Sequence, residues 1–265
     1  QTWMGDADGG WLAALNYAGY MLGAVLAATI RSLYIKDLLF RCGLILAVLT
    51  TAGMALTEHF WVWAGLRFLA GLSSSGSMLL ASGLILHWLM QHRQRGELGI
   101  HFAGLGIGMV VVSVAVEMML QLSFSWQTQW WGFSLLGAAL LVPAWQWLPR
   151  PEKPVVGAPA ANSQPAMPPT RTFMRWMLAA YFCAGYGYVI SATFNWTFAL
   201  AGLAAAPAVM LWDLVARRVG YLGALIIAMC IQVVGILLPA ITANAAAVLL
   251  SAVLYGGTFL GCVSL

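Results

Sequence analysis

The stretch YLGALIIAMCIQVVGILLPAI occupies positions 221–241 and contains no charged residue. A helix needs about 20 apolar residues to cross the hydrocarbon core of a bilayer, and this stretch has that length. A membrane-spanning strand would be shorter and would alternate apolar with polar residues. The stretch therefore predicts a transmembrane helix, and the rest of the chain is searched for segments of the same length and character.

Similar apolar segments follow one another along nearly the whole sequence. They cover positions 11–30, 38–56, 61–89, 98–120, 128–148, 173–194, 196–211, 221–241 and 244–265. The predicted fold class is therefore all-α, a polytopic protein of transmembrane helices. The run 173–211 has no turn cluster where two crossings should meet, so we expect residues to be missing between Phe194 and Asn195. A very tight turn at Thr193–Thr197 is the alternative.

The composition also indicates a membrane protein. Hydrophobic residues make up 62% of the chain and charged residues 8%, whereas soluble domains carry about a quarter charged residues. The net charge is +4, and the charged residues lie mainly between the apolar segments. The membrane explains them, so no nucleic-acid partner is expected. The four cysteines form no CxxC pair, which argues against a disulfide framework or a zinc site.

The basic residues predict the orientation. With nine crossings, eleven of the 12 Lys and Arg residues fall on one side, including Arg31, Lys36 and Arg41 between the first two segments. Cytoplasmic loops are enriched in Lys and Arg, so this side is predicted to be cytoplasmic. The segment 149–172, rich in Pro and Ala, predicts a flexible cytoplasmic linker. It separates an N-terminal bundle at 1–148 from an incomplete C-terminal bundle at 173–265.

Several motifs resemble those of the major facilitator superfamily. RFLAG at 67–71 is followed by Gly76 in the same predicted helix, and the cationic turn WDLVARRVG lies at 212–220. Within the superfamily, GWLAALNYAGYMLGA at 10–24 and LAAAP at 203–207 resemble the YbfB/YjiJ-like group, whose substrate is unassigned.

The resemblance implies a two-bundle transporter of twelve helices, with the second to tenth present here and the first and the last two missing. It also implies that Asp213, Arg217 and Arg218 form a cytoplasmic gate that locks the bundles in one state. A plain anchor on the cytoplasmic side is the alternative for these three residues. In proton-driven exporters a glycine series often ends in Gly-Pro, but here Gly108 runs into Met109, so import and export both stay open.

Two charged residues lie inside predicted spans. An arginine at mid-membrane costs at least about 2.5 kcal/mol, so Arg67 is expected to face the bundle interior. There it would bind an anionic substrate or control the protonation of a carboxylate. Glu117 lies at a similar depth, and the hypothesis is that it pairs with Arg67 and is released by protonation. The alternative for both is a structural residue that reaches the outer rim.

Polar side chains inside the spans must find partners, so some are expected to line a central cavity. The candidates are Asn16, Tyr17, Tyr186 and Tyr188, with helix packing as the alternative for each. Tryptophans near the helix ends indicate an interfacial belt; they include Trp63, Trp126 and Trp130.

These features favour a secondary active transporter that moves a small organic solute by alternating access. The sequence contains no nucleotide-binding loop, so an ion gradient is the expected energy source, with protons as the coupling ion. A membrane-embedded scaffold or enzyme without transport activity is the alternative. No cofactor or metal is expected. The expected partners are membrane lipid, a small-molecule substrate and protons, and the chain is expected to be a monomer in a bacterial inner membrane.

Overall fold

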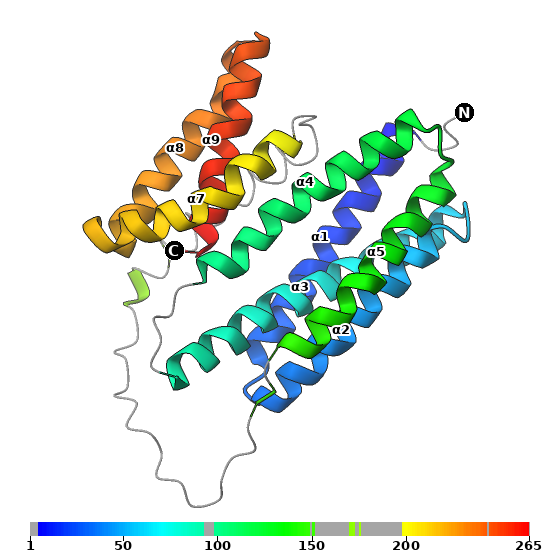
Figure 1. Ribbon diagram of the computed structural model, residues 1–265, viewed down its shortest axis with the longest axis horizontal. Coiled ribbons are helices and arrows are strands. Elements are labelled where there is room, and N and C mark those ends of the chain that lie inside the picture. The colour runs from blue at the N-terminus through cyan, green and yellow to red at the C-terminus, as the bar shows by residue number, and fades with distance from the viewer. Residues whose placement is uncertain are drawn as a thin grey trace, which may run out of the picture. The chain divides into compact units, whose positions relative to one another are not determined.

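The computed structural model describes residues 5–92, 98–148, 150–151, 170–172, 175, 198–242 and 244–264. Within these ranges the elements are helices and there is no strand. In the labels of Figure 1 they are α1 (Asp6–Thr29), α2 (Leu33–Met54), α3 (Phe60–Gln91), α4 (Gly99–Gln121), α5 (Trp126–Trp147), α7 (Phe198–Val219), α8 (Tyr221–Ile241) and α9 (Ala245–Ser264). The predicted all-α fold class is confirmed.

Six of these helices are long and apolar enough to cross a membrane. The spans are Ala7–Thr29, Phe60–Gln91, Gly99–Gln121, Leu200–Val219, Tyr221–Pro239 and Ala245–Val263. Large apolar side chains on them are exposed, for example Met21 and Ile100, as expected where the solvent is lipid and not water. The chain is therefore a multi-pass integral membrane protein.

The second helix begins earlier than the apolar pattern predicted. α2 starts at Leu33, after Ser32, whose side chain accepts a hydrogen bond from a backbone N–H of the first turn. Such a side-chain cap satisfies a donor that the helix itself leaves unpaired. Lys36 and Arg41 therefore belong to the helix, and the prediction that placed them in the preceding loop is wrong.

Packing divides the chain into two compact units, which are described separately. The first comprises Gln1–Gly96 with Met118–Lys153, and the second comprises Glu97–Glu117 with Pro154–Leu265. Most of α4 thus packs with the second unit. The predicted division into bundles at 1–148 and 173–265 rests on topology and stays a prediction.

In the first unit, α1 and α3 pack closely through small residues, as is typical between membrane helices. A Cβ built on Gly19 would overlap the backbone carbonyl of Phe68, and a Cβ on Gly71 would overlap that of Asn16. Only glycine permits backbones this close. The contact sets Asn16 opposite the middle of α3, and α2 packs between α3 and α5.

In the second unit, α9 packs against both α7 and α8 (Figure 1). The Trp212 indole N–H of α7 donates to the Gly257 carbonyl of α9 over 2.7 Å. α4 meets α7 where a Cβ on Gly106 would lie 2.6 Å from the backbone nitrogen of Ala206. Small residues thus also hold this unit together.

Several predictions fall outside the described residues. The linker at 149–172 lies mostly outside them, as do Tyr186 and Tyr188 and the join between Phe194 and Asn195. These predictions stay predictions.

Candidate functional site

A pocket of about 290 Å³ lies between α1 and α3 in the first unit. It is lined by Gly9, Leu12, Ala13, Asn16, Tyr17, Trp63 and Arg67. Three of the predicted candidates, Asn16, Tyr17 and Arg67, therefore line one pocket.

Helical spacing explains why these residues meet. On α1 the lining positions 9, 12, 13, 16 and 17 follow one another at three- and four-residue intervals, and on α3 positions 63 and 67 are four apart. Residues with this spacing share one face of a helix. The Asn16 side-chain amide donates to the Arg67 backbone carbonyl over 2.9 Å, which ties the two faces together.

A tryptophan of α5 contacts the Arg67 side chain, and Trp63 of α3 packs against that ring. The guanidinium carbon lies 5.1 Å from the ring centroid of Trp130 on α5, a cation–π distance. Trp63 is 6% exposed and meets the rings of Trp126 and Trp130 edge to face at 5.7 and 6.2 Å. The sequence predicts both Trp63 and Trp130 as interfacial belt residues. Trp63 also forms part of the pocket wall, and Trp130 supports the Arg67 side chain.

Among the side chains of the first unit that the structure describes, which do not include that of Asp6, no carboxylate pairs with Arg67. Asp37 of this unit pairs with Arg41 at 3.1 Å, and Asp8 accepts a hydrogen bond from the Gly5 backbone. A half-buried cation within a membrane span, such as Arg67, is normally paired or faces water. The pocket therefore presents a positive charge that an anion would neutralise.

Glu117 lies near the end of α4, with an exposed side chain, and by packing it belongs to the second unit. Its ion pair with Arg67 stays a prediction.

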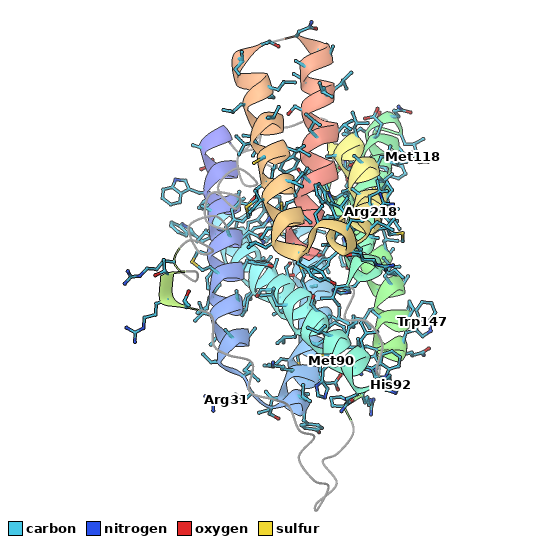
Figure 2. All side chains as sticks on the ribbon, turned by 90° about the vertical axis from the view of Figure 1, so that its left-hand side faces the viewer. Arg31, Met90, His92, Met118, Trp147 and Arg218 are labelled. Carbon is cyan, nitrogen blue, oxygen red and sulfur yellow. The ribbon has the colours of Figure 1, made fainter. Side chains whose placement is uncertain are left out.

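The residues of the predicted gate lie on α7. This helix continues past position 211 to Val219 and ends before Gly220, which has a positive φ of 83°. Arg217 and Arg218 therefore lie in its last turn, where cations interact favourably with the helix dipole; Figure 2 labels Arg218.

The third gate candidate, Asp213, meets the start of another helix. A Cβ on Gly99, the first residue of α4, would overlap an oxygen of the Asp213 carboxylate. The start of a helix carries a partial positive charge that favours a carboxylate. The second unit thus contains a charged contact between a helix side and a helix start, while its role as a gate stays a prediction.

Sequence reasoning missed an ion pair in the first unit. Arg41 is 5% exposed, and its Nε lies 3.1 Å from both carboxylate oxygens of Asp37. Its Nη1 donates to the Trp145 carbonyl over 2.6 Å, so it satisfies an acceptor that the end of α5 leaves open. The spacing of four residues between Asp37 and Arg41 was the available signal.

These features define a polytopic helical membrane protein with a cationic pocket in its first unit. The chain belongs to the family described as the uncharacterised MFS-type transporter YbfB, which matches residues 1–265. The predicted resemblance to major facilitator transporters is confirmed.

Individual relatives match shorter stretches. An uncharacterized MFS-type transporter of Yersinia pestis (strain Pestoides F) is 30% identical over 116 residues, which cover 38% of this chain and 28% of the relative. A protein of the same description from Yersinia pseudotuberculosis (strain IP 31758) matches equally. A steroid transmembrane transporter of Rattus norvegicus is 28% identical over 93 residues, 35% of this chain and 17% of the relative. The matched stretch thus spans less than a third of each relative.

Proposed function

We propose that the protein is a secondary active transporter that moves a small organic anion across a bacterial inner membrane by alternating access, coupled to protons. The observation that carries this proposal is Arg67, which lines a pocket and has no carboxylate partner among the side chains of its unit that the structure describes, Asp6 not being one of them. The membership of a transporter family supports transport as the activity.

The pocket favours an anion with an apolar body. The Arg67 guanidinium is oriented by Trp130, and a planar fork of N–H donors suits a carboxylate. Asn16 and Tyr17 add polar groups, while Leu12 and Trp63 supply apolar surface on the same wall. A few placed polar groups on an apolar wall are typical of small-molecule sites. The rat relative, named a steroid transporter, is consistent with an organic solute.

The packing of each unit supports alternating access. The glycine contacts of α1 with α3, and of α4 with α7, leave no room for sliding, so each unit would move as a rigid body. In transporters of this kind, rigid halves rock around a site near the midplane. The contact of Asp213 with the start of α4 lies within the second unit and would move with it, so a gate formed by Asp213, Arg217 and Arg218 would act on groups outside that unit. Glu117 is the candidate proton carrier.

The test is substrate-driven proton movement in proteoliposomes with an internal pH dye. A panel of aromatic and aliphatic carboxylates, sugars, amines and drugs would be added outside. We expect one or more carboxylates to move protons, and Arg67→Ala to raise the half-saturating concentration roughly 10- to 150-fold, since a charge-assisted hydrogen bond contributes about 1.5–3 kcal/mol. Arg150→Ala, which removes an exposed arginine, is the control.

Each other outcome removes a part of the proposal. If radiolabelled carboxylates cross the membrane without proton movement, the proposed transport activity stands and the proposed proton coupling is excluded. Uptake of neutral or cationic compounds only, unaffected by Arg67→Ala, would refute the anion site. Folded protein that moves nothing would favour a scaffold or an enzyme.

A further inference from the structure

We propose that a second pocket of the first unit holds one acyl chain of an anionic phospholipid. This pocket has a volume of about 180 Å³ and lies between α1, α2 and α3. We call it the acyl groove. Its walls include Leu26 and Ile30 of α1, Leu39 and Leu46 of α2, and Leu72 and Leu80 of α3. The proposal is independent of what the protein transports.

The chemistry of the acyl groove excludes a polar occupant. Apart from the Cys42 thiol, the polar side chain in its lining is Ser73, whose hydroxyl already donates to the Ala70 carbonyl over 2.8 Å. Water needs two to four polar partners to occupy a cavity, and these walls do not offer them. An apolar chain would gain dispersion contacts with every wall.

The rim of the acyl groove faces the membrane interior. Leu26 and Leu39 line it and are 48% and 39% exposed. Their neighbours Val25 and Leu38 are also exposed. α1 is one of the membrane-spanning helices, and there exposed side chains such as Leu26 and Val25 contact acyl chains. The fluid that meets the opening is therefore hydrocarbon, and lipid tails are its most abundant component.

Two cations mark one end of the acyl groove. Ile30 lines it, and Arg31 follows directly, just beyond the end of α1 (Figure 2). On α2 the lining residues Leu39, Gly43 and Leu46 form a stripe, and Lys36 continues that stripe one turn earlier. Neither cation forms an ion pair with a described residue. This end lies on the predicted cytoplasmic side, where long basic side chains contact anionic headgroups.

The glycines of α3 provide a matched pair of variants. Gly76 lines the acyl groove, and a Cβ built on it meets nothing within 4 Å. Gly83 lies on the same helix, also has open space around its Cβ, and does not line the groove. Gly76→Leu would therefore fill the groove without a clash at Cβ, and Gly83→Leu would make the same change elsewhere.

The experiment is native mass spectrometry of the protein released from nanodiscs of phosphatidylglycerol and phosphatidylcholine in equal amounts. We expect one retained phospholipid, with phosphatidylglycerol enriched roughly 5- to 25-fold, since each basic residue near the surface contributes about a fivefold preference. Gly76→Leu should retain at least tenfold less, and Gly83→Leu as much as the unmodified protein. The double variant of Arg31→Gln and Lys36→Gln should keep a lipid and lose the preference.

Three results would overturn the proposal: no retained lipid, equal retention by Gly76→Leu and Gly83→Leu, or equal retention of the two lipids by the unmodified protein. If Gly76→Leu does not fold, the proposal is tested on the unmodified protein by photo-cross-linking to phosphatidylglycerol that carries a diazirine on its acyl chain. Cross-links should fall on Leu46, Leu72 and Leu80. Cross-links spread over exposed residues of all helices, with none at these three, would refute the groove.

Discussion

Replacing Arg41 by methionine should destabilise the first unit strongly. The guanidinium binds the Asp37 carboxylate and the Trp145 carbonyl, and its carbon lies 4.9 Å from the Trp145 ring centroid. The side chains of Arg41 and Asp37 are only 6% and 10% exposed. Methionine has a similar length and no donor, so the change leaves both acceptors buried without this partner.

The magnitude follows from the burial of the pair. Removing one partner of a buried ion pair costs about 3–5 kcal/mol, because the other charge stays in the interior. We expect Arg41→Met to lower the free energy of unfolding by this amount. Combining it with Asp37→Leu removes both charges and should recover most of the loss, since apolar replacement of a whole buried pair is often neutral.

The assay is reversible unfolding in bicelles, followed by the fluorescence of the tryptophans. Arg150→Met, which replaces an exposed arginine, is the control and should lie within about 0.5 kcal/mol of the unmodified protein. The reasoning is refuted if Arg41→Met differs from this control by less than about 1 kcal/mol. It is refuted equally if the double variant is less stable than Arg41→Met alone.

Two further predictions concern the pocket and its frame. Trp130→Leu removes the ring that contacts the Arg67 guanidinium. It should weaken binding of the transported anion about 2- to 30-fold, because cation–π contacts contribute about 0.5–2 kcal/mol. Unchanged affinity of Trp130→Leu for that anion, measured by calorimetry, would contradict this role of Trp130. Gly71→Ala places a Cβ against the Asn16 carbonyl and should lower the free energy of unfolding by about 1–3 kcal/mol. Gly65→Ala, where a Cβ meets nothing, should be neutral or stabilising, and equal effects of the two alanines would contradict the close packing.

The sequence was sufficient to predict the helices that the structure describes, apart from some of their ends, and part of the pocket. A 20-residue apolar run has few alternatives to a membrane helix, and a polar group within it must find a partner. These two arguments identify Asn16, Tyr17 and Arg67, which the structure places in one pocket.

What was missed depends on contacts between helices. Local hydropathy places Trp63 and Trp130 near helix ends, and it cannot show that their rings meet across α3 and α5. It also cannot separate a loop cation from a buried one, so Arg41 was assigned to the membrane surface although it binds Asp37 and the end of α5. Tertiary partners, and not the charge itself, decide where an arginine lies.

The membership of α4 in the second unit has a consequence for biosynthesis. Gly106 of α4 packs on Ala206 of α7, and about a hundred residues separate them along the chain. At a translation rate of about 5–20 residues per second, α4 is inserted roughly 5–20 s before its partner exists. During that interval its glycine face must be covered by lipid or by the insertion machinery, so a pause in translation after position 121 would prolong the most vulnerable state of the nascent protein.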